Sequence, residues 1–155
     1  MLEVKHIMKL KGYMQGYYDM FHVGHLNVIK RAAKLCDELT VGVMIDEECL
    51  RNKGHLPTIP FKDRIEIIKN IKGVHDAVPV YEDDILKDWD PGDFKIVFIC
   101  EVHRTKPGWE ETAKRLSKEG VTIIYMPYTY GISSSGIRDR IKNEKFNSVD
   151  KVSNG

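Results

Sequence analysis

The sequence predicts an α/β fold in which helices cover both faces of a parallel sheet. Five short runs rich in β-branched and apolar residues have the composition of strands, and they lie at 10–15, 38–45, 76–80, 95–100 and 121–126. Segments with apolar residues at helical spacing separate most of these runs. Strands and helices that alternate in this way form a doubly wound, Rossmann-like sheet with right-handed crossovers. We therefore expect a single domain of about five strands over residues 9–142.

The first half of the chain is expected to hold two of the strands and three helices. The strand at 10–15 leads into a glycine turn and then a helix, whose apolar stripe consists of Leu26, Ile29, Ala33 and Cys36. After the strand at 38–45, residues 46–52 are expected to form a short helix and residues 53–59 a loop. Pro60 then opens a helix that Gly73 closes and whose apolar stripe consists of Phe61, Ile65, Ile68 and Ile71.

The second half begins with the strand at 76–80 and an acidic segment at 81–93 without a regular pattern. The strand at 95–100 precedes a helix that ends before Gly120 and carries on one face Trp109, Ala113 and Leu116. After the last strand, a helix is expected to begin near Ser134, with Ile137 and Ile141 on its inner face. The polar residues 143–155 are expected to form a frayed tail.

Composition limits the partners of the chain. Its 155 residues carry 24 Lys and Arg against 23 Asp and Glu, a formal net charge of +1. Proteins that bind nucleic acid or anionic membranes usually carry a basic excess, so neither partner is expected. Residues 1–10 alternate charged and apolar side chains, which predicts neither a signal peptide nor a membrane span. The chain has no Cys-x-x-Cys pair, and we expect free thiols in the cytoplasm for Cys36, Cys49 and Cys100.

The stretch from Gly16 to His25 reads as the end of a strand, a glycine turn and the start of a helix. The first turn of a helix leaves backbone N–H groups without partners and carries the positive end of the helix dipole, so it is a site for phosphate. His22 and His25 lie beside this site, and both can donate hydrogen bonds to an oxyanion. Gly16 is expected to permit the sharp turn, and Gly24 to leave room for phosphate near the main chain.

A second stretch, at 128–135, combines a glycine with three hydroxyl groups at a helix start. Gly131 and Ile132 precede Ser133, Ser134 and Ser135. These hydroxyls and the adjacent backbone N–H groups could hold the β- and γ-phosphates of a triphosphate, and the alternative is ordinary capping by one serine. Because ligands of such sheets bind at the carboxyl ends of the strands, we expect both stretches to meet at one edge, together with residues 100–104.

The two stretches carry a family resemblance. The first resembles the signature of the nucleotidyltransferase superfamily with the His-x-Gly-His motif, and the second is similar to the Arg-Thr-Glu-Gly-Ile-Ser-Thr-Thr of its cytidylyltransferases. The likeness extends over about residues 12–142. It implies transfer of CMP from CTP to a small phosphorylated alcohol, most like glycerol 3-phosphate, with release of pyrophosphate. It also implies a homodimer and a nucleotide that brings Mg²⁺, held chiefly by phosphate oxygens and water rather than by a protein metal site.

The resemblance assigns roles to individual residues. His22 and His25 would stabilise the charge that develops on the phosphates, and Lys53 would steady the triphosphate and the acceptor phosphate. The residues expected to bind the nucleotide are Gly16, Tyr17, Tyr18, Gly24, Glu101, Tyr128, Gly131, Ile132, Ser133, Ser134 and Ser135. Arg138 and Arg64 are further candidates for phosphate contacts. Arg64 is placed on the polar side of its helix, where pairing with Asp63 or Glu66 is the alternative.

Several positions depart from the family pattern and leave other functions open. Residues 100–103 are Cys-Glu-Val-His, whereas the glycerol-phosphate enzymes that the chain resembles have Gly-Asp-Asp-Trp at this place. Tyr128 and Tyr130 replace an arginine and a glutamate, for which His103 and Arg104 are candidate substitutes, and Tyr17 stands where threonine is frequent. One alternative is an adenylyltransferase that uses ATP and a flavin-type or other phosphorylated acceptor. The other is a nucleotide-binding paralogue that has lost catalysis.

Overall fold

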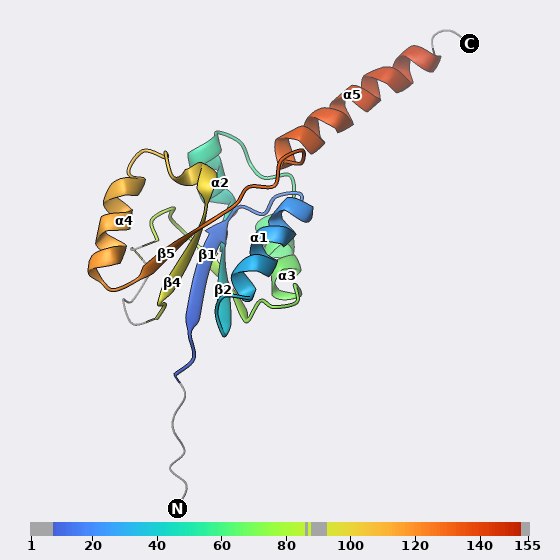
Figure 1. Cartoon of the computed structure of the whole chain (residues 1–155). Coiled ribbons are helices and arrows are strands. Elements are labelled where there is room, and N and C mark those ends of the chain that lie inside the picture. Colours follow the sequence, from blue (N-terminus) through green and yellow to red (C-terminus); the bar gives the residue numbers. More distant parts are fainter. Residues whose placement is uncertain (1–7, 86, 88–92, 153–155) are drawn as a thin grey trace, which may run out of the picture.

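The computed structural model describes residues 8–85, 87 and 93–152. The strands within these residues form one parallel five-stranded sheet. The sheet order is β3-β2-β1-β4-β5 (Figure 1). The strands are β1 (Lys11–Gly16), β2 (Glu38–Met44), β3 (Asp76–Val80), β4 (Ile96–Cys100) and β5 (Thr122–Met126). Every observed strand lies within one residue of its predicted bounds, which confirms the predicted doubly wound fold.

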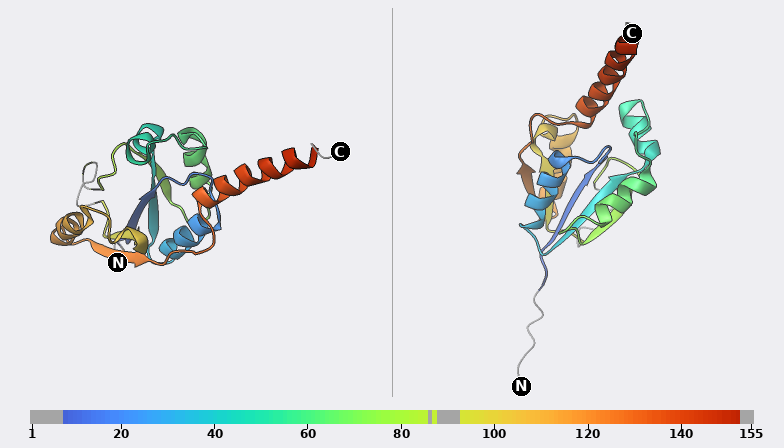
Figure 2. Two further views of the ribbon diagram at one scale, coloured as in Figure 1. Left: turned by 90° about the horizontal axis from the view of Figure 1, so that it is seen from above. Right: turned by 90° about the vertical axis from the view of Figure 1, so that its right-hand side faces the viewer.

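The helices of the described residues are α1 (Val23–Ala33), α2 (Asp46–Lys53), α3 (Phe61–Lys69), α4 (Trp109–Lys118) and α5 (Ser134–Val152), with a 3-10 turn, η1 (Glu101–His103). Helices α1 and α3 lie on one side of the sheet and α4 lies on the other (Figures 1 and 2). No helix within the described residues is long and apolar enough to cross a membrane.

Alternation along the strands builds a core on each face of the sheet. Leu39, Val41 and Val43 of β2 point to the same face and pack in one cluster with Ile29 of α1 and Ile68 of α3. On the other face, a second cluster joins β4 and β5 to α4 and contains Val97, Trp109, Leu116 and Val121. Because both faces of β4 are covered, this strand is apolar from Ile96 to Cys100 without a break.

Some predicted details at the element ends are wrong. Helix α1 stops at Ala33, so Cys36 packs against the core from the turn that follows rather than from the helix. Gly54 closes α2 in the left-handed conformation, so Lys53 is the last helical residue and not a loop residue. Ile141 is 47% exposed and does not face the core.

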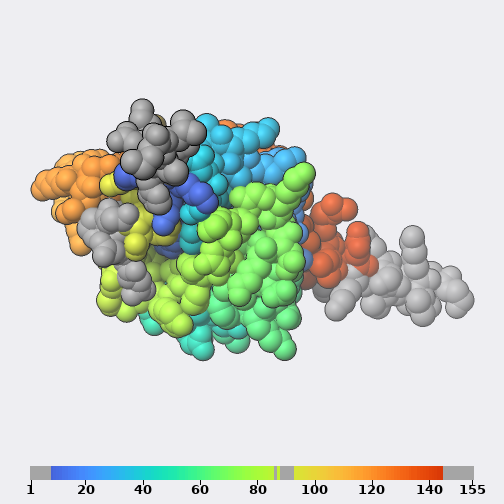
Figure 3. All heavy atoms as spheres, turned by 90° about the horizontal axis from the view of Figure 1, so that it is seen from below, coloured from blue at the N-terminus to red at the C-terminus, as the bar shows by residue number. Residues whose placement is uncertain are grey.

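In the segment that was expected to form a frayed tail, α5 continues as a helix to Val152. The chain has no Gly or Pro from residue 137 to residue 154, so nothing in the sequence breaks the helix. Helix α5 projects away from the sheet (Figures 1 and 2), and in Figure 3 its first residues, in red, lie at the edge of the molecular surface. Residues 1–7, residues 86 and 88–92 of the acidic segment, and residues 153–155 of the tail lie outside the described residues.

Candidate active site

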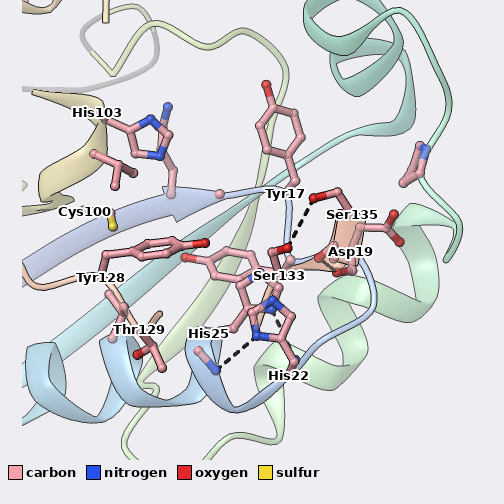
Figure 4. A pocket seen from close by; sticks show the side chains of 18 of the residues that line it. Tyr17, Asp19, His22, His25, Cys100, His103, Tyr128, Thr129, Ser133 and Ser135 are labelled. Atoms are coloured by element: carbon pink, nitrogen blue, oxygen red, sulfur yellow. Dashed lines mark hydrogen bonds between the residues drawn. The ribbon is translucent and has the colours of Figure 1, made fainter. Parts of the chain in front are cut away.

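A cavity of about 370 Å³ lies at the carboxyl ends of the strands, where the segments after β1, β4 and β5 meet. This volume is within the usual range for small-molecule sites. The residues around the cavity in Figure 4 include His22, His25, His103, Tyr128 and Ser133. The two stretches expected to meet at one edge of the sheet therefore do so, and residues 100, 102 and 103 join them.

His22 and His25 lie with their rings stacked at the start of α1, with ring centroids 3.8 Å apart. The Nδ1 of His22 accepts a hydrogen bond from the backbone N–H of Gly24 at 3.0 Å, and the Nδ1 of His25 accepts one from the backbone N–H of His22 at 3.2 Å. In a neutral imidazole, a nitrogen that accepts leaves the proton on the other nitrogen. Each ring therefore keeps its Nε2–H as a donor.

Both rings are held in the neutral form. Burial lowers the pKa of His25 to about 4, and the charges of His22 and Lys53 act in the same direction. Burial also lowers the pKa of His22 below its ordinary value of 6.5. At neutral pH the pair consequently offers two N–H donors without two positive charges.

The glycines of the first stretch leave room for neighbouring aromatic rings. A Cβ on Gly24 would lie 2.8 Å from Cε1 of His22, so a larger residue here would displace the histidine ring. A Cβ on Gly16 would lie 3.0 Å from Cζ of Tyr18, whose ring folds back over the strand end. The sharp turn itself is made by Tyr18 and Met20, whose φ angles of 53° and 50° are in the left-handed region.

Asp19 connects three segments of the site. Its carboxylate accepts hydrogen bonds from the backbone N–H groups of Thr58 and Ile59, both at 2.9 Å, and from Nη1 of Arg138 at 3.1 Å. Its backbone carbonyl accepts a bond from Oγ of Ser134. Burial alone would raise the pKa of Asp19, but the hydrogen bonds and the charge of Arg138 outweigh burial and lower it. The Asp19 side chain therefore fixes the 54–60 loop and α5.

The three serines differ in their contacts. Oγ of Ser133 accepts the backbone N–H of Gly136 at 3.0 Å and caps α5. Ser134 is used by the bond to Asp19 at 2.5 Å. Ser135 is exposed, and its hydroxyl lies 3.2 Å from that of Ser133. One serine therefore caps the helix while all three line the cavity. Of the three hydroxyl groups, that of Ser135 is best placed to turn to a ligand.

Lys53 lines the cavity from the end of α2. Its Nζ lies 3.9 Å from the ring centroid of Tyr17, which also lines the cavity. Burial lowers the pKa of Lys53 below its ordinary value. Together with Arg138, Lys53 supplies positive charge to a cavity in which His22 and His25 are neutral.

The structure does not bring every expected residue into the cavity. Arg64 is fully buried, so its predicted place on the polar side of α3 is wrong. It donates from Nε to the carbonyl of Ile59, from Nη1 to the carbonyl of Tyr17 and from Nη2 to the carboxylate of Asp46. These acceptors come from other segments, and this is why the helix pattern alone did not reveal the burial. We therefore leave Arg64 out of the proposed phosphate contacts.

Three other expected nucleotide contacts also lie outside the cavity lining: Glu101, Gly131 and Ile132. Glu101 accepts the backbone N–H of Tyr128 at 3.1 Å and so supports the loop that carries Tyr128. Arg104 lies over the ring of Tyr125 at 4.2 Å rather than in the cavity.

Sequence reasoning missed several residues that line the cavity. His55 and Pro57 come from the loop that Asp19 holds, and Val28 and Thr129 come from α1 and the segment after β5. The position of His55 could have been predicted from Lys53, because a candidate site residue directly before Gly54 indicated that the following loop lies at the site. The apolar positions carried no signal that distinguished them from core residues.

Comparison with known proteins places the chain in a family. Residues 13–140 match the family described as Cytidylyltransferase-like. The chain belongs to the cytidylyltransferase-like family of nucleotidyltransferases. The expected superfamily is therefore confirmed, while the expected likeness to the glycerol 3-phosphate enzymes is finer than this match shows.

The chain is similar to two kinds of named protein. It is 33% identical over 139 residues to an ethanolamine-phosphate cytidylyltransferase from Arabidopsis thaliana, and the match covers 83% of this chain but 31% of the plant protein. It is 32% identical over 150 residues to an FAD synthase from Pyrococcus horikoshii, with 88% of this chain and 89% of that protein covered. An FAD synthase from Thermococcus kodakarensis is 30% identical over 132 residues, with 79% and 83% covered.

Solved structures share the fold. A lipopolysaccharide core biosynthesis protein from Thermoplasma volcanium is 26% identical, with a TM-score of 0.64 over 79% of this chain and 98% of that one. A protein of unknown function from Archaeoglobus fulgidus is 18% identical, with a TM-score of 0.57 over 80% and 94% of the two chains, and it supports the fold alone.

Proposed function

We propose that the protein transfers AMP from ATP to the phosphate of a flavin-type acceptor and releases pyrophosphate. The FAD synthases support this proposal better than the expected CMP transfer, because they match over most of their own length. Flavin adenine dinucleotide contains AMP joined to a flavin mononucleotide through a pyrophosphate, which is the linkage that such a transfer forms. The observation that carries the nucleotidyl transfer is the pair of Nε2–H donors beside the serine-capped start of α5.

In the proposed reaction, an oxygen of the acceptor phosphate attacks the α-phosphorus of ATP. The new P–O bond forms as the bond to the β-phosphate oxygen breaks, and pyrophosphate leaves with that electron pair. His22 and His25 would donate their Nε2–H groups to the oxygens on which negative charge grows. Ser135, Arg138 and Lys53 would hold the leaving phosphates. Mg²⁺ enters only with the triphosphate and would neutralise part of its charge.

A second candidate, transfer of CMP from CTP to a phosphorylated alcohol, is favoured by the match to the plant ethanolamine-phosphate enzyme. That match covers only part of the plant protein, so it bears on the transferase domain rather than on the whole activity. The third hypothesis, a binding protein without catalysis, predicts stabilisation by nucleotide and no release of pyrophosphate.

The test is a pyrophosphate-release assay of the purified full chain with Mg²⁺. ATP and CTP are each offered with flavin mononucleotide, phosphoethanolamine and glycerol 3-phosphate. The expected result is pyrophosphate release only when ATP is paired with flavin mononucleotide, with FAD detected as the product by mass spectrometry. Exclusive use of CTP would overturn the base assignment, and thermal stabilisation without turnover under any pairing would favour the inactive paralogue.

A further inference from the structure

Tyr17 sits between the buried scaffold and the cavity. Its backbone carbonyl accepts the bond from Nη1 of Arg64 at 2.5 Å, and its ring packs against a small cluster made of Met44, Cys49 and Val80. The side chain is half-buried and also lines the cavity. A ring that is fixed at its backbone and packed against three apolar residues has little freedom to move, so it presents a constant surface to the cavity.

Lys53, in contrast, has few restraints of its own. It is the last residue of α2, and Gly54 follows it in the left-handed conformation with φ of 73°. Within the described residues, no carboxylate forms an ion pair with its ammonium group. Nζ lies over the face of the Tyr17 ring, 3.9 Å from the ring centroid. The negative charge density on the ring face attracts a cation.

We propose that Tyr17 is a positioning residue that holds the Lys53 ammonium at the edge of the cavity, ready to bind polyphosphate. The ammonium has three N–H donors, so Lys53 can keep its contact with the ring and donate to a phosphate at the same time. Without the ring, a flexible lysine next to a glycine spreads over many rotamers, and binding must order it. This proposal rests on the proposed function, because it assumes that polyphosphate occupies the cavity.

The test measures the binding of inorganic tripolyphosphate by calorimetry, which requires no turnover. Tyr17→Phe keeps the ring, and its affinity should stay within about twofold of the wild type. Tyr17→Leu keeps apolar bulk against Met44 but removes the ring face, and its affinity should fall by about fivefold to thirtyfold. Tyr81→Leu, at an exposed tyrosine outside the cavity lining, is the matched control and should bind like the wild type.

The decisive comparison repeats the Tyr17→Leu change in a Lys53→Met background. If Tyr17 acts through Lys53, the second change adds no loss of affinity once the lysine is gone. An equal loss in both backgrounds would overturn the proposal, because Tyr17 would then contact the ligand itself or act only through the fold. An unchanged affinity of Tyr17→Leu in the wild-type background would overturn it as well.

A measurement on the unaltered protein covers the case in which Tyr17→Leu does not fold. The Lys53 ε-methylene protons should be shifted upfield by the ring, and saturating tripolyphosphate should leave this shift in place. A normal shift without ligand, or a shift that tripolyphosphate abolishes, would contradict the proposal. Tripolyphosphate binding that depends on Tyr17 without any pyrophosphate release would contradict the proposed transferase activity while leaving this inference intact.

Discussion

Oγ of Ser134 donates a 2.5 Å hydrogen bond to the backbone carbonyl of Asp19, although the two residues lie 115 positions apart in the chain. This bond joins the start of α5 to the turn that precedes α1. The carboxylate of Asp19 extends the same junction to Arg138 and to the 54–60 loop. The cavity is therefore assembled around one residue, and the effect of changing that residue can be predicted.

Asp19→Asn should destabilise the protein by about 1–3 kcal/mol. The variant keeps the backbone carbonyl that Ser134 uses, but it removes the charge that pairs with Arg138 and one of the two carboxylate oxygens. An N–H group of Thr58 or Ile59 then loses its acceptor. Urea unfolding at pH 7 measures the change, and the exposed Asp139→Asn serves as control within about 0.5 kcal/mol. Equal stability of the two variants would contradict the role of Asp19 as a junction.

Local pattern was sufficient to predict the strands, the helix starts and the edge of the sheet at which the site lies. It was not sufficient for Arg64, because a helix pattern compares a residue only with its own helix. The acceptors of Arg64 lie 5, 18 and 47 positions away, and they make burial of a guanidinium tolerable. The extent of α5 was missed for the opposite reason, since a polar composition favoured a frayed end although the segment contains no helix breaker.

His22→Asn should separate catalysis from helix capping. Asparagine is a good N-cap and can replace the Nδ1 acceptor that binds Gly24, but it lacks the Nε2–H donor. We expect turnover to fall by about 10²–10³ while the free energy of unfolding changes little. His22→Ala should show the same loss of turnover and also lose about 1 kcal/mol of stability. His75→Asn, at an exposed histidine outside the cavity lining, is the control, and near-normal turnover of His22→Asn would contradict the assigned role.

Acid should destabilise the protein through His25. Its pKa of about 4 in the folded state lies below the ordinary value of 6.5, so the unfolded chain binds more protons between these two pH values. The contribution of His25 to the free energy of unfolding is therefore fully present above pH 6.5. The free energy of unfolding should fall by about 2–3 kcal/mol as the pH drops to 4. The lowered pKa of His22 acts in the same direction, whereas Asp19 contributes only below about pH 4. Urea unfolding at several pH values tests this, and the slope should be shallower in His25→Gln.

The three serines should respond differently to alanine. Ser133→Ala removes the cap of α5 and should cost about 1 kcal/mol of stability. Ser135→Ala should leave stability unchanged and reduce turnover about tenfold, because the exposed Ser135 hydroxyl can turn from Ser133 to a phosphate. Thermal unfolding and pyrophosphate release together distinguish these outcomes, with the exposed Ser117→Ala as control. Full turnover of the Ser135→Ala variant would contradict the proposed phosphate contact of Ser135.

Replacing Arg64 should damage the fold before it affects the chemistry. Arg64→Met preserves much of the side-chain volume but leaves the carbonyls of Ile59 and Tyr17 without donors and the Asp46 carboxylate without its partner. We expect the free energy of unfolding to fall by about 3 kcal/mol. This value is at the lower end of the range for a broken buried ion pair, because the Asp46 carboxylate is partly exposed to solvent. Arg64→Lys should be only partly tolerated, since one ammonium cannot reach three acceptors in the fixed directions of a guanidinium. Arg115→Met on the exposed side of α4 is the matched control, and a stability of Arg64→Met equal to that of the control would show that the buried guanidinium does not hold these segments together.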